Sequence, residues 1–426
     1  MKKPYLIFIL AFSVLARLGA ALFFGNGVEI LPGTFDQLSY HHLALRLIEG
    51  HGFTFAEPWW PLTDAGEPTA HWSFLYTFYV TAVYFLFGPN PLVARIIQVI
   101  IVGLLQPYLV YLIGKHLFDE RVGLVAAGLT AVYIYFIYYA ATLMTEPFYI
   151  TAILAALYLS LRLADARPDQ QTWLTLLLAV ALIVTIHLRQ LFLLFVPFLF
   201  LWILWRRYQQ SRPLPLLPLV LIVGLIVGSI LPFTYYNYQR FDQVVLLNTN
   251  AGFAFFWGNH PVYGTRFHGI LPPELGNYLE LVPRELRDLG EAELEQALLQ
   301  RGLQFIVDDP VRYFWLSLSR IPIYFTFWPT ADSSLLSNIS RVASFGILLP
   351  FMVYGLGLFL WRRSWRDWLR HPALLLLLFA GVYTAVHVLT WTLIRYRLPV
   401  DAIMLIFAAI ALLEIRMLRE IVIKGV

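Results

Sequence analysis

The sequence predicts an all-α polytopic membrane protein. Hydrophobic residues make up 59% of the 426 residues and charged residues only 13%, with a mean hydropathy of +0.69. Soluble domains carry a larger share of charge, roughly 25%. Many apolar stretches are continuous and reach the ~17–25 residues that a helix needs to cross a bilayer, whereas a transmembrane β-barrel would show alternating patterns. We therefore expect a bundle of transmembrane helices.

Ten stretches are expected to span the membrane. The first follows Met1-Lys2-Lys3 and is longer than the apolar part of a cleavable signal peptide, so it is interpreted as a spanning helix. The expected spans are residues 5–23, 93–114, 122–141, 147–163, 172–187, 190–205, 214–233, 341–360, 373–391 and 398–415.

Charge on the short loops sets the expected orientation, because Lys and Arg next to helix ends favour the cytoplasmic side. The clusters assigned to that side are 2–3, 115–121, 162–167, 206–212, 362–370 and 416–424. If the apolar stretches 72–87 and 311–328 also crossed, the clusters behind them would lie on the wrong side. We expect these two stretches to be helices in the outer interface. Two further genuine spans remain the alternative.

The chain is interpreted as one transmembrane domain, residues 1–426, with two large outer segments at 25–91 and 235–340. The second segment contains a soluble-looking helix at 291–307. Both segments are rich in Trp, Tyr, Pro and Gly, which suits polypeptide folded against a membrane surface. The functional site is therefore expected on the extracytoplasmic side.

Two acids stand near helix ends in these regions. Asp36 precedes a stretch of helical periodicity, where it could simply cap exposed N–H groups. Glu146 lies at the outer end of the third span, and an acid so close to hydrocarbon is costly and usually marks a site. Because the topology puts both acids on one side, they could bind a metal, orient a sugar or act as a base.

Arg189, Arg395 and Arg397 are expected at the same depth as the acids. Each arginine alone could extend its charge to the lipid headgroups. Several together, facing two acids, indicate a phosphate-bearing substrate, because a guanidinium binds phosphate through two parallel hydrogen bonds.

The stretch 248–269 combines Asn, Gly and aromatic residues, which suits either a wall that stacks on a sugar or an ordinary turn with aromatic residues at the interface. His260 and His268 could ligate a metal, but their spacing matches no metal motif. The chain has no cysteine, which excludes disulfides, thiolate catalysis and Cys-ligated metals. The net charge of +4 is spread over short loops and does not indicate a nucleic-acid partner.

The order of these motifs resembles the GT-C superfamily of membrane glycosyltransferases, in particular the branch related to protein O-mannosyltransferases and lipid A aminoarabinose transferases. The resemblance covers nearly the whole chain. It is carried by FDQLSYHHLALRLIEGHGF (35–53), EPTAHWSFLYTFYVTAVYFLFGPNPLVARIIQ (67–98), YAATLMTEPFY (139–149), FFWGNHPVYG (255–264) and RYRLPVD (395–401). One departure is His71-Trp72-Ser73-Phe74-Leu75-Tyr76, where relatives usually carry Pro-Pro-Tyr-Pro.

The resemblance implies a GT-C-type bundle of about 10 transmembrane helices that transfers a sugar from a polyprenyl-phosphate donor to an acceptor hydroxyl, with inversion. Asp36 would be the catalytic base and Glu146 would assist it. The acceptor could be a glycan, a lipid or a protein. No cofactor is required, and the resemblance leaves room for a divalent cation. The substrate-binding residues that it implies are Tyr40, His41, His71, Arg189, Asn259, His260, Arg395 and Arg397.

Two other functions fit the composition. A transporter or flippase for lipid-linked saccharides would share the apolar helices and the outer cations, and should show repeat symmetry or acids buried in mid-span. A non-catalytic assembly partner would keep the fold, but the presence of both acids and of the C-terminal Arg pair argues against it. The expected location is a bacterial-type plasma membrane.

Overall fold

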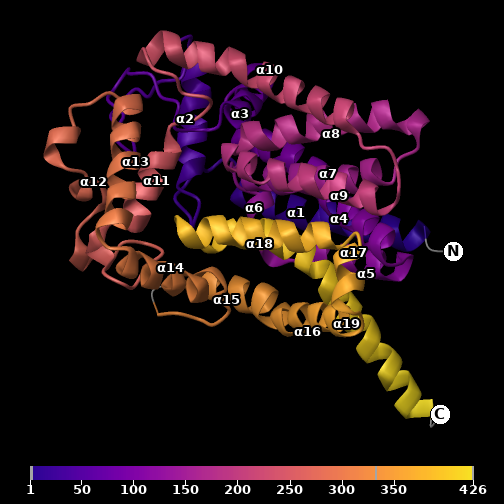
Figure 1. Ribbon diagram of the computed structural model, residues 1–426. Helices are drawn as coiled ribbons and strands as arrows, with labels where there is room; N and C mark the ends of the chain where they lie inside the picture. Colours follow the sequence, from indigo (N-terminus) through magenta and orange to yellow (C-terminus); the bar gives the residue numbers. More distant parts are fainter. Residues whose placement is uncertain (1–2, 332, 425–426) are drawn as a thin grey trace.

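The computed structural model describes residues 3–331 and 333–424, with side chains from Pro4 through Arg416. Long helices run side by side as the body of the molecule, and shorter helices gather at one end (Figure 1). No β-strand occurs in the described ranges. The predicted all-α fold class is confirmed.

All ten expected spans are helical. Among the described residues, seven helical runs are long and apolar enough to cross a membrane. They are α1 (Lys3–Phe24), α4 (Pro91–Leu117), α7 (Glu146–Ala164), α8 (Pro168–Leu188), α10 (Leu216–Phe241), the run of α15 (Leu335–Arg341), η5 (Val342–Gly346) and α16 (Ile347–Trp361), and the run of η6 (Ile394–Arg397) and α19 (Leu398–Lys424).

Three further helices complete the expected set. α5 (Glu120–Val132) and α6 (Ile134–Ala140) together form an eighth candidate span, bent by 56°. α9 (Val196–Gln209) and α18 (Leu374–Leu389) have 14 and 16 residues, fewer than the ~17 needed to cross. The expected count of ten is therefore approximate.

The break between α5 and α6 interrupts the expected span 122–141. Tyr133 is extended there (φ −67°, ψ 111°), so the last carbonyls of α5 have no helical partner. Arg17 of α1, which is fully buried, donates to the carbonyls of Thr130 and Ala131 at 3.2 and 3.3 Å. A buried arginine thus satisfies the helix end and directs α6 toward the start of α7.

Local sequence explains where several helices begin. Ser73, Asn90 and Asp119 each accept a backbone hydrogen bond in the first turn of α3 (Phe74–Phe87), α4 and α5. Small residues allow the closest helix contacts. A side chain at Gly114 of α4 would meet Gly123 of α5 at 2.9 Å.

α3 and α14 (Pro310–Tyr324) correspond to the stretches 72–87 and 311–328. They have 14 and 15 residues, fewer than the ~17 that a helix needs to cross a bilayer. Their interfacial position stays a prediction.

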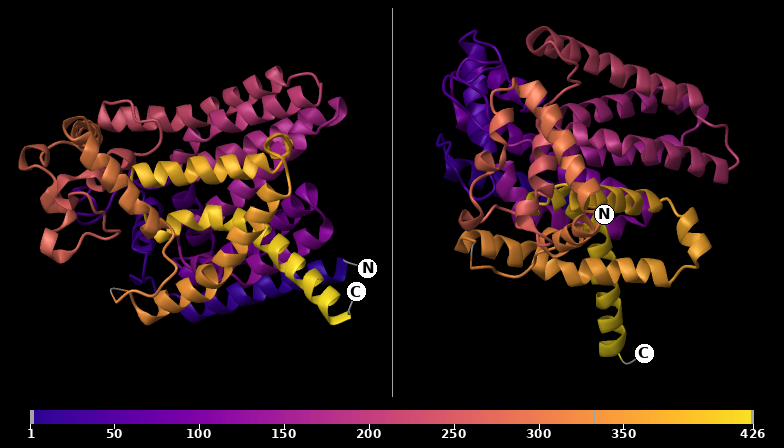
Figure 2. Two further views of the ribbon diagram at one scale, coloured as in Figure 1. Left: turned by 60° about the horizontal axis from the view of Figure 1, so that its bottom comes forward. Right: turned by 60° about the vertical axis from the view of Figure 1, so that its left-hand side comes forward.

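The shorter helices α2 (Asp36–Ile48), α11 (Asn250–Asn259), α12 (Tyr278–Leu281) and α13 (Glu291–Asp308) lie together at one end of the body, called the α13 end below (Figures 1 and 2). The helix expected at 291–307 is therefore present. Residues 25–91 and 235–340, far apart in sequence, come together here.

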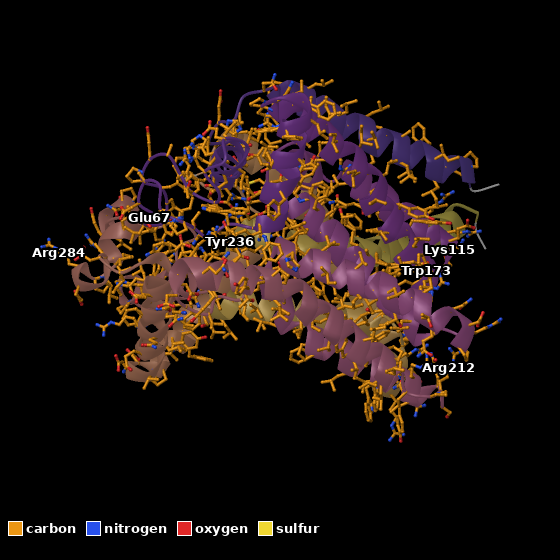
Figure 3. All side chains as sticks on the ribbon, turned by 90° about the horizontal axis from the view of Figure 1, so that it is seen from above. Glu67, Lys115, Trp173, Arg212, Tyr236 and Arg284 are labelled. Carbon is orange, nitrogen blue, oxygen red and sulfur yellow. The ribbon has the colours of Figure 1, made fainter. Side chains whose placement is uncertain are left out.

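Basic loops occupy the opposite end. Lys115 and Arg212 lie at one end of the molecule in Figure 3, and Glu67 and Arg284 lie at the other. The basic loops and the two large segments are thus separated, and the side of the membrane that each faces stays a prediction. Lys2 and the side chain of Lys3, which make up the first cluster, lie outside the described residues, as do the side chains of the last cluster beyond Arg416.

Candidate active site

Asp36 is the first residue of α2, and its carboxylate faces an arginine from the other end of the chain. Asp36 Oδ2 lies 2.8 Å from Arg395 Nη1, and the Asp36 side chain is 21% exposed. Phe35 occupies the N-cap position of α2 without a side-chain cap. The ion pair with Arg395, rather than a simple capping role, therefore defines the surroundings of this acid.

The turn before α2 requires a glycine. Gly33 has φ +72°, a conformation that L side chains rarely adopt, and a Cβ there would lie 2.8 Å from Tyr139 Oη. The Gly33 carbonyl also accepts a hydrogen bond from Arg395 Nη1 at 3.2 Å. Arg395 thus holds both the turn and the acid that follows it.

Glu146 is the first residue of α7 and is 2% exposed. Its Oε1 accepts a hydrogen bond from Arg189 Nη2 at 2.5 Å, and Arg395 Nε lies 3.6 Å from the same oxygen. Arg189 Nε also donates to Thr145 Oγ1 at 3.1 Å. A buried carboxylate needs such compensation, because removing a charge from water is costly.

Asp36, Glu146, Arg189 and Arg395 therefore form one cluster, in which Arg395 contacts both acids. Two negative and two positive charges balance. The Arg395 and Arg189 side chains are 12% and 19% exposed, so the cluster grades from buried Glu146 to the more accessible Asp36. The sequence prediction that these two acids and these two arginines lie together agrees with this geometry.

Buried polar side chains hold the segment that leads into α7. Gln98 of α4 donates to the carbonyls of Ala140 and Thr142 at 2.8 and 2.7 Å, and accepts from Tyr76 Oη at 2.8 Å. Arg95, one turn earlier, donates to the carbonyl of Gly25 at 2.5 Å. The Arg-x-x-Gln motif of α4 therefore positions both chain segments that carry the acids.

Tyr40 and His41 lie on α2 behind Asp36. Tyr40 is 5% exposed and packs edge-on against Trp72 and Tyr76. Burial, and secondly the charge of Asp36, raise the pKa of the Tyr40 hydroxyl. His41 Nδ1 lies 2.7 Å from Tyr84 Oη, and burial lowers the pKa of His41 to about 4. His41 is neutral near pH 7 and already has a protein partner.

His71 is partly buried between Trp72 and Phe253. Its Nδ1 is buried and has no hydrogen-bond partner in the part of the chain that the structure describes, and burial lowers the pKa of His71 to about 3. His71 is thus neutral.

Asn259 and His260 lie at the end of α11, and their side-chain partners among the described residues are other than Asp36 and Glu146. Asn259 is fully buried, and its amide accepts from Arg320 at 2.9 Å and donates to the carbonyl of Phe255 at 2.9 Å. His260 Nδ1 accepts from the Val262 N–H at 3.1 Å, and burial lowers its pKa to about 4. These polar groups stabilise a local turn, and the structure does not bring them to the cluster.

Arg397 also lies apart from the cluster, although it is only two residues from Arg395. It is fully buried, with Nε 2.9 Å from Asp401 Oδ1, and it donates to the carbonyl of Tyr324 at 2.6 Å. Asp401 in turn accepts from Tyr133 Oη at 2.7 Å. The guanidinium of Arg397 is engaged in the bundle interior, so the geometry gives no support to its predicted contact with a substrate phosphate.

Glu291, which the sequence did not single out, joins the two large segments. Its carboxylate accepts from Thr63 Oγ1 at 3.0 Å, from the Ala70 N–H at 2.8 Å and from Thr249 Oγ1 at 2.6 Å. Burial raises the pKa of Glu291. An acid at the start of an amphipathic helix looks like an ordinary first-turn charge, so only long-range contacts reveal this role.

The acids of the cluster do not form a metal site. Across the part of the chain that the structure describes, no group of three or more His, Asp or Glu side chains could hold an ion. Asp36 and Glu146 could supply two oxygens, but Arg395 already lies between them. The donor set does not fit a divalent cation without displacing that arginine.

Comparison with known proteins places this geometry in a known fold. The oligosaccharyltransferase of Archaeoglobus fulgidus in its apo form matches with 17% identity and a TM-score of 0.57, over 99% of this chain and 52% of that chain. The same organism's AglB in complex with an inhibitory peptide and a dolichol-phosphate matches with 15% identity and a TM-score of 0.56, over 100% and 52%. ArnT from Cupriavidus metallidurans bound to undecaprenyl phosphate matches with 14% identity and a TM-score of 0.50, over 97% and 60%.

These matches confirm the predicted GT-C-type helical fold. The chain spans about half the length of the oligosaccharyltransferase chains that it matches. A model of the dolichyl-phosphate-mannose-protein mannosyltransferase family matches residues 71–235. No curated protein sequence matches the chain. The chain is thus an integral membrane protein with a GT-C-type fold.

Proposed function

We propose that this protein is an inverting glycosyltransferase that moves a sugar from a polyprenyl-phosphate donor to an acceptor hydroxyl, at the extracytoplasmic face of a bacterial-type plasma membrane. The observation that carries the proposal is the contact of Arg395 with both Asp36 and Glu146 at the α13 end. The GT-C fold and the family model support the reaction class. The lipid phosphates bound by AglB and ArnT support the donor class.

Asp36 is the proposed base, because it is the more exposed of the two acids. The acceptor hydroxyl gives its proton to Asp36, and its oxygen forms the bond to the anomeric carbon. The bond between that carbon and the phosphate oxygen breaks, and the electron pair leaves with the phosphate. Attack opposite the leaving group inverts the configuration.

Arg395 is the proposed partner of the donor phosphate. Glu146 is compensated by Arg189 at 2.5 Å, whereas its contact with Arg395 is longer, at 3.6 Å. A phosphodiester beside Arg395 would compete with Asp36 for that guanidinium and leave the Asp36 carboxylate available to accept a proton. The ion pair of Arg189 and Glu146 holds the rest of the cluster in place.

His71 is the proposed contact to the acceptor, since its buried Nδ1 has no hydrogen-bond partner among the residues that the structure describes. No divalent cation is part of the proposal. Guanidinium groups supply the positive charge that a metal ion would otherwise give to the leaving phosphate.

The experiment is sugar transfer from a panel of radiolabelled undecaprenyl-phosphate sugars to membrane acceptors. We expect Asp36→Asn to stay folded and to lose about 10²-fold or more of turnover, because an amide does not take up the proton. Asp64→Asn, which changes another and exposed acid of the same segment, is the matched control and should keep wild-type turnover. Full activity of Asp36→Asn would remove Asp36 from the mechanism.

The same radiolabelled donors distinguish a transporter of lipid-linked saccharides from a glycosyltransferase. It would move the labelled lipid across the bilayer of a vesicle without forming a new glycosidic bond. The acid buried near the end of a long helix, Asp401, is paired with Arg397 and Tyr133 and therefore does not favour transport.

A further inference from the structure

Five neighbouring side chains beside the acids form a closed circle, called the ring below: Arg189, Tyr149, Tyr383, His387 and Tyr396. Of these five, the reaction proposed above uses only Arg189. Arg189 lies over the rings of Tyr149 and Tyr396 at 5.5 and 5.4 Å. The ring centroids of Tyr149 and Tyr383 are 6.5 Å apart, those of Tyr383 and His387 are 4.8 Å apart, and those of His387 and Tyr396 are 4.8 Å apart. The ring joins α7, α18 and η6 to the charged cluster.

One polar atom of this ring, His387 Nε2, is buried without a hydrogen-bond partner among the described residues. The hydroxyls of Tyr149 and Tyr383 are buried beside it and interact with each other. The side chains of Tyr149, Tyr383 and His387 are 1%, 3% and 5% exposed. Leaving a buried polar group unpaired costs about 1–3 kcal/mol, so the lone imidazole nitrogen calls for an explanation.

The chemistry of these atoms indicates a hydroxyl-bearing ligand. His387 Nδ1 lies 3.3 Å from the carbonyl of Trp391, which can only accept, so Nδ1 carries the hydrogen. In a neutral imidazole Nε2 is then an acceptor. An ionised phosphate has no hydrogen to offer such a nitrogen, whereas a sugar hydroxyl can donate to it and also accept from the tyrosine hydroxyls.

The position of the ring indicates the sugar of the donor. Arg189 and Tyr396 are the partly exposed members, and Arg189 also belongs to the charged cluster that carries Arg395. The donor sugar is joined directly to the phosphate and must lie within one bond of it. Aromatic faces such as those of Tyr383 and Tyr396 also suit the apolar face of a sugar ring.

We propose that Tyr149, Tyr383 and His387 bind the hydroxyl groups of the donor sugar and thereby select which polyprenyl-phosphate sugar is used. This inference rests on the proposed glycosyltransferase function. It assigns the selectivity for the sugar to the ring and leaves the phosphate to the guanidinium groups.

The test compares donors that differ by one hydroxyl. The donors are undecaprenyl-phosphate mannose, glucose and arabinose, together with single-deoxy analogues of the donor that is transferred fastest. We expect Tyr383→Phe, Tyr149→Phe and His387→Phe each to lower kcat/KM for the full sugar about 3- to 10-fold, as the loss of one hydrogen bond does. For one deoxy analogue the variant and the wild-type protein should then have equal kcat/KM.

Tyr135→Phe is the matched control, because Tyr135 is also a buried tyrosine but lies outside the ring. It should leave kcat/KM unchanged for every donor. An equal loss on full and deoxy sugars in the ring variants would show a merely structural role and overturn the inference. Wild-type kcat/KM in all three ring variants would overturn it too. If the wild-type protein transferred no sugar from any donor, the proposed function itself would fail.

Discussion

Replacing Glu146 by glutamine tests whether the cluster is held together by a buried charge pair. The Glu146 side chain is 2% exposed and lies 2.5 Å from Arg189, which is 19% exposed. Removing one partner of a buried pair costs about 3–5 kcal/mol, because the remaining charge stays out of water without compensation. Glutamine keeps one acceptor oxygen, and Arg189 retains some solvent, so we expect the lower end of that range, about 3 kcal/mol.

The assay is thermal unfolding of the purified protein in detergent. With an unfolding entropy of ~2.1 cal/mol/K per residue, a chain of 426 residues shifts by about 1 °C per kcal/mol, so Glu146→Gln should lower Tm by about 3 °C. The double variant Glu146→Gln/Arg189→Gln should lose less than the sum of the two single variants, because it leaves no lone charge from this pair.

The chain provides a matched control for burial. Arg362 and Glu414 are separated by the same 2.5 Å, but the Arg362 side chain is 55% exposed. Exposed pairs contribute little to stability, so Glu414→Gln should shift Tm far less than Glu146→Gln. A shift for Glu146→Gln no larger than that of the control would refute the argument that burial makes the pair essential.

The geometry supports four other predictions. Arg395→Gln should raise the KM for donor at least about tenfold with the protein still folded. Arg397→Gln should chiefly lower Tm, because the partner of Arg397 is a buried acid. The reverse pattern in kinetics and melting curves would contradict the roles of these two arginines. Burial lowers the pKa of His71 to about 3, below the ~6.5 of an unfolded histidine. As the pH drops from about 6.5 toward 3, the unfolded state therefore binds the proton before the folded state does, and Tm should fall. In His71→Phe that part of the slope should disappear from the melting series. Gly33→Ala should lower both Tm and transfer, since φ is +72° and the new methyl would meet Tyr139 at 2.8 Å; unchanged values would show that the turn adapts. Metal chelators should leave the transfer rate unchanged, and loss of transfer restored by added Mn²⁺ or Mg²⁺ would require a metal in place of Arg395.

Much of the fold could be predicted because it rests on local patterns. Continuous apolar stretches and basic loops located the helices, and the long helices begin and end close to the expected bounds. The number of spans could not be predicted as well, because α9 and α18 are shorter than their apolar stretches suggested. The bend between α5 and α6 depends on Arg17, more than a hundred residues away, and no local pattern carries that information.

In the candidate site, too, some features could be predicted from the sequence and others could not. Asp36, Glu146, Arg189 and Arg395 could be placed together because loop charge put all four on one side of the membrane. The interpretation of Asn259 and His260 as substrate contacts rested on composition and on the resemblance, and neither says which polar atoms are already used by the protein. Their side chains hydrogen-bond within α11 and the turn that follows it or to Arg320.

Arg395 and Arg397 show that sequence spacing alone does not predict the direction of side chains at the start of a helix. Two residues apart, they would share a face in a strand, but η6 is a 3₁₀ turn and sends them in different directions. Arg395 turns outward to Asp36 and Glu146, and Arg397 turns inward to Asp401 one turn later. The inner pair fixes the start of α19, and that start fixes the backbone from which Arg395 reaches the two acids. Arg397 therefore affects the candidate site only by fixing the start of α19. The buried charge of Arg397 is as necessary to the cluster as the charge of Arg395, which lies within it.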